Sequence, residues 1–359
     1  MELQKFINDN EEYLKTFKDH KLYVRKYSRL GLALVKCYRN NKYDYKLHPW
    51  LKYCRGAIIN TKTNKLVCIP PVKSLERKYD INEIIDQYDG ENEYQPLIEG
   101  TMINMFFHND QWMIATRSNI GAKNSWEKGD SFLDMFLDVY GDSWFNELKK
   151  NYCYSFVLSH INNRIVSKIE ESSIFLIENY ELGDIPIRKE LDNISTIEQM
   201  FNLPIEYLRN YDSILPFSIK GFTIKSKGNR VNWINPEYTH VEGLKMNYND
   251  PYLNYIALRQ SRLLSEYLKY FPEDQHIFQQ YRIYFNVIKQ ELYESYVSHF
   301  IRKERELNNI SYPLRPLLFE LHKYYKETGE KINVKIVSDY LHNLPGKRML
   351  FINNYLFNK

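Results

Sequence analysis

The sequence predicts an α+β fold in two parts, an antiparallel-sheet domain over residues 1–240 and an all-helical domain over residues 241–359. Two observations predict this. In the first part, short segments rich in apolar residues follow one another with brief polar turns between them, which is typical of antiparallel hairpins. After about residue 240 the apolar residues recur every three or four positions, which indicates amphipathic helices. The chain has 359 residues, which is enough for two domains.

The first part is expected to contain nine strands and four helices. A hairpin is clearest around His108-Asn109-Asp110, where two apolar strands flank a three-residue polar turn. The expected strands are 22–27, 32–38, 56–60, 65–69, 102–107, 111–116, 154–158, 173–177 and 220–225. The expected helices are 2–19, 79–88, 130–149 and 195–201.

The second part predicts four helices. Asp250-Pro251 is a good helix start, because the carboxylate can cap the first N–H groups and proline suits the first helical position. An apolar stripe follows down to Phe271-Pro272, and a second helix runs over roughly 273–306. Pro313 and Pro316 frame the start of a third helix, which ends at Gly329, and a fourth begins near Asn333.

Composition narrows the class of protein. The net charge of +4 neither demands nor excludes nucleic acid. The four cysteines and nine histidines show no metal-ligand spacing, and scattered cysteines indicate a reducing, cytoplasmic compartment. No apolar run is long enough for a bilayer, so we expect no membrane partner. The 31 tyrosines fit either an AT-rich genome or surfaces that stack on bases.

Seven short patterns follow one another in a fixed order. They centre on Leu97-Ile98-Glu99-Gly100-Thr101, which ends one strand, turns at a glycine and starts the next. The others are Arg55-Gly56-Ala57-Ile58-Ile59, Ile69-Pro70-Pro71-Val72-Lys73-Ser74, Ala115-Thr116-Arg117-Ser118, Tyr154-Ser155-Phe156-Val157-Leu158 with Asn163-Arg164-Ile165-Val166, Lys220-Gly221-Phe222-Thr223-Ile224, and 230–238. Together they resemble the nucleotidyltransferase superfamily of RNA ligases and mRNA capping enzymes, and most closely phage-type RNA ligases. The helical part more closely resembles degenerate ligase-like proteins of large DNA viruses.

The resemblance implies an ATP-grasp-like RNA ligase domain and a covalent reaction that this sequence lacks the groups to perform. In that reaction a lysine amine attacks the α-phosphorus of a nucleoside triphosphate, carboxylates hold the ribose and a metal, and paired lysines neutralise phosphates. The nucleophile position is Leu97 and the ribose carboxylate position is Val157. The metal carboxylate position is Lys220, and the paired lysine positions are Asn232 and Ile234. We therefore expect no catalytic residue and no metal ligand.

Other positions still match the family or carry suitable charge. The expected nucleotide- or RNA-binding residues are Arg55, Lys73, Glu99, Gly100, Arg117, Arg164, Lys225 and Lys227. Their cations would contact phosphates, and nearby tyrosines would stack on bases. The best interpretation is a catalytically degenerate ligase-like protein that binds RNA or a nucleotide- or cap-like group.

Three alternatives remain at this point. An active RNA ligase or guanylyltransferase would use a displaced lysine, Lys73 or Lys123, and only then would ATP or GTP and Mg²⁺ be required. A structural or assembly subunit would bind a protein partner through the helical domain. The plainest alternative makes the lysines ordinary exposed side chains, Glu99-Gly100 a simple turn, and Arg117 and Arg164 members of structural ion pairs.

Overall fold

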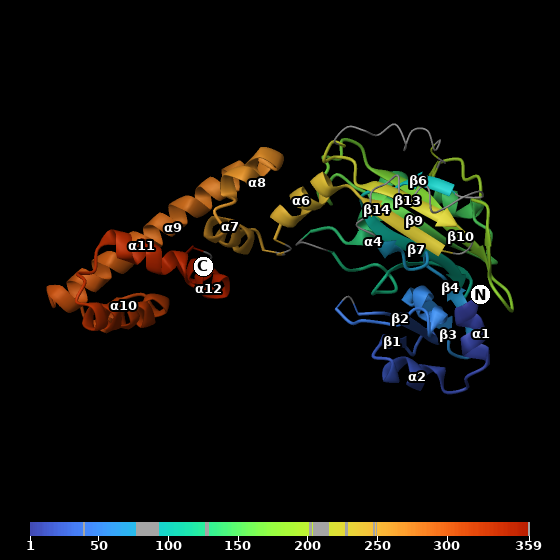
Figure 1. Cartoon of the computed structure of the whole chain (residues 1–359), viewed down its shortest axis with the longest axis horizontal. Helices are drawn as coiled ribbons and strands as arrows, with labels where there is room; N and C mark the ends of the chain where they lie inside the picture. Colours follow the sequence, from blue (N-terminus) through green and yellow to red (C-terminus); the bar gives the residue numbers. More distant parts are fainter. Residues whose placement is uncertain are drawn as a thin grey trace. The chain divides into compact units, whose positions relative to one another are not determined.

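The computed structural model describes residues 1–38, 40–76, 93–125, 129–200, 203, 215–226, 229–246, 248 and 250–357. The chain divides into two compact units, Met1–Thr239 and His240–Lys359. In the described residues, the first unit contains three sheets, whose strands are mostly antiparallel, and the second unit is helical (Figure 1). The expected fold class, antiparallel sheets followed by a helical C-terminal region, is confirmed.

The first sheet is an antiparallel meander of four strands under two helices. Its order is β1-β2-β3-β4, with β1 (Tyr23–Tyr27), β2 (Leu32–Lys36), β3 (Arg55–Asn60) and β4 (Lys65–Cys68). The expected helix 2–19 is instead two helices, α1 (Glu2–Asn8) and α2 (Tyr13–Asp19). The break follows from Asn10, whose side-chain oxygen accepts the Glu12 N–H at 3.1 Å and so favours a turn over helix.

The second sheet is the largest and lies at the centre of the unit. Its order is β11-β10-β9-β7-β8, and the short β12 pairs with β10. The bounds are β7 (Thr101–His108), β8 (Gln111–Thr116), β9 (Tyr152–Ser159), β10 (Ser173–Glu181), β11 (Ile187–Lys189) and β12 (Glu198–Gln199). The expected helix 195–201 is wrong, because Glu198–Gln199 forms this strand, parallel to β10.

One face of the central sheet is covered by helix α4 (Phe132–Tyr140). Phe136 of the helix and Phe156 and Leu158 of β9 share an apolar core and are fully buried. The expected helix 130–149 is too long, because Gly141 adopts the left-handed φ of 65° and ends it. A short 3-10 turn, Ser143–Glu147, follows.

The third sheet has one apolar and one polar face. Its order is β5-β14-β13-β6, with β5 (Leu75–Glu76), β6 (Glu93–Pro96), β13 (Gly221–Ser226) and β14 (Asn229–Ile234). Alternate residues of the strands form a small apolar cluster, made of Tyr94, Phe222, Ile224 and Val231 with Leu215. The remaining residues form the opposite face, which is described with the site below. The expected helix 79–88 lies outside the described residues.

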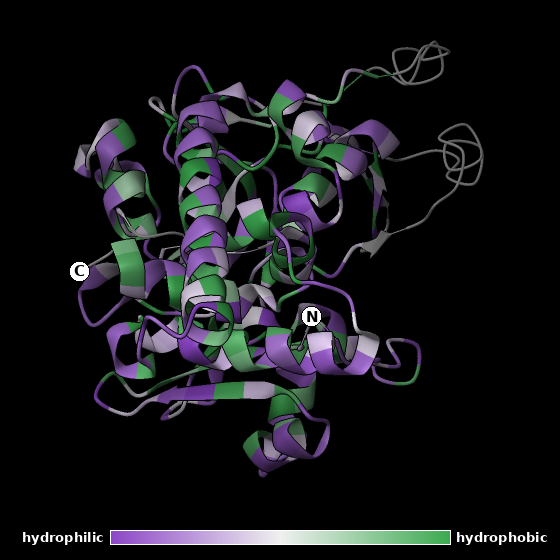
Figure 2. Ribbon diagram, turned by 90° about the vertical axis from the view of Figure 1, so that its left-hand side faces the viewer, coloured by the Kyte–Doolittle hydropathy of each residue, from purple (hydrophilic) through white to green (hydrophobic). Residues whose placement is uncertain are grey.

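The second unit consists of amphipathic helices. In Figure 2 hydrophobic and hydrophilic positions alternate along the helices. Their bounds are α6 (Pro236–Leu244, which crosses the unit boundary), α7 (Pro251–Gln260), α8 (Leu264–Tyr270), α9 (Gln275–Tyr296), α10 (Arg315–Thr328), α11 (Val334–His342) and α12 (Gly346–Phe357). Among the described residues, no helix combines the length and the apolar content that a bilayer span requires.

The expected caps of these helices are present, but the helices expected up to Phe271 and over 273–306 are shorter, and the second of them, α9, ends at Tyr296 before a π-helical turn. The Asp250 carboxylate accepts the Tyr252 and Leu253 N–H groups, and Asn333 caps α11 in the same way. Gly329 ends α10 in the left-handed conformation. The stripe expected to continue to Phe271 is interrupted after α7, where Arg262 has φ 60°.

Candidate functional site

The positions of Leu97, Asn232 and Ile234 converge on the third sheet. The Leu97 N–H donates to the Gly221 carbonyl at 2.9 Å, directly after β6. On the neighbouring strand, Gly221 pairs with Ile234 and Thr223 with Asn232. Residues that face each other in antiparallel strands project to the same side, so Asn232 and Ile234 share one face of the sheet. The Asn232 side-chain oxygen is already engaged, since it accepts the Thr223 hydroxyl at 3.0 Å.

Val157 and Lys220 complete the set of five positions. A Cβ on Gly100 would lie 2.2 Å from the Leu158 carbonyl oxygen and 2.8 Å from Val157 Cγ1, so only glycine fits against β9 here. The Lys220 ammonium lies 5.4 Å from the centre of the Tyr238 ring. The five positions named by the family pattern therefore come from segments that touch one another, and none of the five side chains is a carboxylate.

Glu99 is built into the structure rather than held open. Its carboxylate accepts the backbone N–H groups of Ile165, Val166 and Ser167 at 3.0, 2.8 and 3.1 Å. Only 8% of the residue is exposed. Arg164 belongs to the same loop, and its Nε donates to the Val166 carbonyl at 3.1 Å. Glu99 and Arg164 thus fix the loop after β9 and hold it beside the Gly100 turn.

Three arginines meet where the first and second sheets touch. A Cβ on Gly56 would lie 2.7 Å from Arg117 Cα, so the backbone after Arg55 rests directly on Arg117. Burial and, to a lesser extent, the charges of Arg55 and Arg230 together lower the pKa of Arg117 to about 9. The side chain itself still reaches solvent. We name Arg55, Arg117 and Arg230 the arginine cluster.

Arg117 is the member of the arginine cluster that lacks a carboxylate partner among the described residues. Arginine remains protonated in proteins, so the depressed pKa of Arg117 measures repulsion and lost hydration rather than a neutral side chain. Within the part of the chain that the structure describes, no carboxylate forms an ion pair with Arg117. A solvent-accessible guanidinium held beside two others is an arrangement that an anionic group would stabilise.

A row of charged residues crosses the polar face of the third sheet beside this cluster. In register, Lys225 of β13 faces Glu93 of β6 on one side and Arg230 of β14 on the other. Only 6% of Lys225 is exposed, and its ammonium donates to the Ile177 carbonyl at 3.1 Å. Burial lowers the pKa of Lys225 to about 8, although the nearby Glu178 carboxylate opposes the shift.

Glu178 and Arg188 connect the third sheet to the second. Arg188 forms a bidentate pair with Glu93, at 3.3 and 2.9 Å, and lies 3.8 Å from Glu178. The Tyr180 hydroxyl donates to Glu178 at 2.7 Å. Lys225 also lies 3.8 Å from both carboxylates. Glu178 also acts on Arg230, so the two carboxylates lie among Lys225, Arg188 and Arg230, and in the described part of the chain neither forms an ion pair with Arg117.

The structure brings some expected binding residues together and separates others. Lys73 and Arg55 both lie close to the Cys37 thiol, since the charge of each lowers its pKa. Burial has the larger effect and raises that pKa to about 11. Lys123 is exposed on the loop before α4. Lys227 lies outside the described residues.

Sequence reasoning missed Arg230, Glu178, Arg188 and Glu93. Arg230 could have been found from the sequence. In a β-hairpin it pairs with Lys225, and paired residues place their side chains on the same face of the sheet. The other three come from segments far apart in the sequence and had no local signal.

The described residues do not fit the metal site that the family resemblance implies. No group of three histidine, cysteine or acidic side chains among them is placed to hold a metal ion. The carboxylate of Glu99 is occupied by three backbone donors, and Lys220 brings positive charge to the position of a metal ligand. We therefore derive no step through a metal.

Comparison with known proteins gives one relative in sequence and several similar solved structures. No protein-family model matches the chain. The chain is 25% identical over 188 residues to a putative bifunctional polynucleotide kinase/RNA ligase of Autographa californica nuclear polyhedrosis virus. That match covers 46% of this chain and 26% of the viral protein, so it spans well under half of the relative's length.

Two of the similar solved structures are ligases. A putative ATP-dependent DNA ligase from Aquifex aeolicus superposes with a TM-score of 0.44 and 10% identity, over 96% of this chain and 80% of that one. An archaeal ATP-dependent RNA ligase superposes with a TM-score of 0.44 and 10% identity, over 76% of this chain and 70% of that one.

Proposed function

We propose that this chain, which is RNA ligase-like and of the nucleotidyltransferase superfamily, binds the phosphates of RNA or of a nucleotide- or cap-like group without covalent nucleotidyl transfer. The observation that carries the proposal is the arginine cluster. Its Arg230 lies on the same strand as Asn232 and Ile234, and its Arg117 reaches solvent and forms no ion pair with a carboxylate among the described residues. The cluster offers charge-assisted hydrogen bonds to a phosphate, which needs no chemistry at Leu97.

The loss of five groups argues against a covalent step. The side chain of leucine carries no amine, so no phosphoramide bond can form at Leu97. The carboxylate and lysine positions of the family have also changed, at Val157, Lys220, Asn232 and Ile234. Residues that act as a catalytic unit are strongly non-additive, and removal of one costs about as much as removal of all. Five simultaneous changes are what we expect after selection for the reaction has ended.

An active enzyme with a displaced lysine is the second candidate, and one observation favours it. Lys225 is an amine with a pKa of about 8, on the same sheet as the strand end at Leu97. A lowered pKa is what a lysine nucleophile requires. Against this, Lys225 is buried and bonded to a backbone carbonyl, so it would have to leave those contacts to reach a phosphorus atom.

Adduct formation separates the two candidates. The purified full chain is incubated with α-labelled ATP or GTP and Mg²⁺ or Mn²⁺, denatured, and examined for a covalently labelled band. We expect no band. A band that disappears in Lys225→Met, Lys73→Ala or Lys123→Ala would establish the active alternative and identify the nucleophile.

Phosphate binding tests the proposal directly. Pyrophosphate and a short RNA are titrated into the wild-type protein, Arg117→Ala and the control Arg29→Ala, which removes an exposed arginine from the β1–β2 turn. We expect Arg117→Ala to weaken binding of both ligands at least tenfold, and Arg29→Ala to leave it unchanged. Equal binding by all three proteins would reject the arginine cluster as the binding site, and no binding to wild type would instead favour an assembly subunit whose helical domain meets a protein partner.

A further inference from the structure

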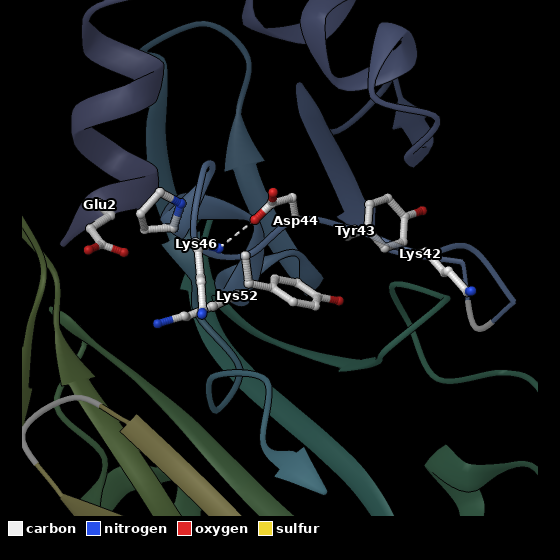
Figure 3. Close-up of a pocket in the computed structure, with 8 residues that line it drawn as sticks. Glu2, Lys42, Tyr43, Asp44, Lys46 and Lys52 are labelled. Carbon is white, nitrogen blue, oxygen red and sulfur yellow. Dashed lines mark hydrogen bonds between the residues drawn. The ribbon is translucent and has the colours of Figure 1, made fainter.

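An open depression lies on the first unit, outside the five altered positions. Its volume is about 940 Å³, which is within the range of ligand sites. It is formed by α1 and by the segment between β2 and β3, and Figure 3 shows its side chains. Its lining residues are Glu2, Lys42, Tyr43, Asp44, Tyr45, Lys46, Pro49 and Lys52.

The lining combines aromatic rings with cations. The rings of Tyr43 and Tyr45 are neighbours, with centroids 6.2 Å apart and planes inclined by 45°. Lys42 and Lys46 are exposed. In Figure 3, Lys46 and Lys52 lie toward one end of the depression and Lys42 toward the other, with Tyr43 on the side of Lys42. Rings with cations on both sides suit a base and its flanking phosphates.

The segment that carries these side chains is held in place before any ligand arrives. The Tyr43 hydroxyl donates to the Lys21 carbonyl and accepts the Tyr38 N–H, both at 3.0 Å. Asp44 accepts the N–H groups of Lys46 and Leu47 at 2.9 Å. These backbone bonds hold the pKa of Asp44 below its usual range and commit its carboxylate to the loop. The acid therefore stabilises the depression more than it opposes an anion.

The depression borders the arginine cluster. The Lys73 N–H donates to the Lys52 carbonyl at 2.8 Å, which joins the two segments. Burial raises the pKa of Tyr45, and the charge of Arg55 acts in the opposite direction. The Arg55 guanidinium therefore lies close to the Tyr45 ring. A run of positive charge thus continues from Lys46 and Lys52 to Arg55.

We propose that this depression binds a nucleotide of single-stranded RNA, with its base against Tyr43 and Tyr45 and its flanking phosphates at Lys42, Lys46 and Lys52. The strand then continues to the arginine cluster, and to that extent the inference rests on the function proposed above. RNA is favoured over a protein partner because the depression places two aromatic rings between lysines, which suits a base and its flanking phosphates.

Photo-crosslinking locates the contact. A short RNA with 5-iodouridine at successive positions is irradiated with the full chain, and the modified peptide is identified by mass spectrometry. We expect the crosslink on Tyr43 or Tyr45; a crosslink on Tyr43 should be lost in Tyr43→Leu, and one on Tyr45 should be lost in Tyr45→Leu. A crosslink confined to other peptides would overturn the inference.

Titration tests the lysines. Lys42→Ala/Lys46→Ala removes two exposed side chains, and Lys15→Ala/Lys18→Ala on α2 is the matched control. We expect the first pair to weaken RNA binding about tenfold and to reduce the slope of log K against log salt by about 1.4, at about 0.7 for each single-strand phosphate contact. The control pair should bind as wild type does. Unchanged affinity and slope in the first pair would refute the inference.

Pyrophosphate separates the two proposals, because it offers phosphate groups to the arginine cluster but no base to the rings of the depression. Lys42→Ala/Lys46→Ala should bind pyrophosphate as wild type does, whereas Arg117→Ala should not. Loss of RNA binding in the lysine pair with normal pyrophosphate binding in Arg117→Ala would retain the depression and reject the arginine cluster. The reverse pattern would retain the cluster and reject the depression.

Discussion

Glu99 Oε1 accepts the N–H of Val166 at 2.8 Å, across 67 residues of sequence. The same carboxylate also binds the N–H groups of Ile165 and Ser167. We predict that Glu99→Ala lowers the free energy of unfolding of the first unit by about 3 kcal/mol, because it leaves several donors without their charged acceptor. Urea denaturation followed by fluorescence measures this.

The exposed Glu171 provides the control for that measurement. Glu171→Ala should change stability by less than about 0.5 kcal/mol. If Glu99→Ala behaves like Glu171→Ala, then the carboxylate does not hold the loop, and Glu99 is again available as a ligand-binding group.

Gly100 gives a second prediction about the same turn. Its φ of 152° and the 2.2 Å approach of a built Cβ to the Leu158 carbonyl leave no room for a side chain. Gly100→Ala should therefore force β7 and β9 apart and greatly reduce the yield of folded protein. Gly183→Ala, where nothing lies within 4 Å of the added carbon, should fold normally. Circular dichroism and gel filtration of the two variants compare them, and a folded Gly100→Ala protein would contradict the close approach.

These two residues also show what the sequence can and cannot predict. The Gly100 turn and its flanking strands were predictable, because alternating apolar residues and a glycine are local signals. The partners of Glu99 were not, since their sequence separation exceeds 60 residues and a backbone N–H leaves no mark in a sequence. The helix expected at 195–201 failed for a related reason, because pairing with the distant β10 decided the conformation of Glu198–Gln199.

The arginine cluster follows the same division. Arg55 and Arg117 were predicted by resemblance, but their contact through Gly56 depends on how two sheets meet. The position of Arg230 opposite Lys225 could have been worked out from the hairpin register. Only the structure shows that Glu178 lies close to Lys225 and forms no ion pair with Arg117. Glu178 is on β10 and Lys225 is on β13, and these strands are far apart in the sequence.

Lys225 predicts a stability that depends on pH. Burial lowers the pKa of this amine from 10.5 to about 8 in the folded protein. Between those values the unfolded chain still holds a proton that the folded chain has lost, so the free energy of unfolding should rise with pH from about 8 to 10.5. The full gain is about 3 kcal/mol, at about 1.4 kcal/mol for each pKa unit.

The comparison with Lys225→Met isolates this contribution. Urea denaturation at several pH values across the window should show a rise in wild type that is reduced by that amount in the variant. Absolute stability does not matter for this test, because only the change of the free energy of unfolding with pH is compared between the two proteins. Parallel pH curves for the two proteins would show that Lys225 has an ordinary pKa, and would also remove the main support for Lys225 as a displaced nucleophile.

Restoring the nucleophile alone tests how complete the loss of chemistry is. We predict that Leu97→Lys forms no covalent adduct with α-labelled ATP or GTP in the presence of a divalent metal. The new amine would lie beside the strand end that pairs with Gly221. It would still lack a carboxylate at Val157 and a metal ligand at Lys220, so neither the ribose nor the metal would be positioned. An active RNA ligase in the same assay shows that labelling works, and pyrophosphate binding by Leu97→Lys shows that the variant is folded. A labelled band in Leu97→Lys that is absent from wild type would mean that one substitution, and not five, separates this chain from catalysis.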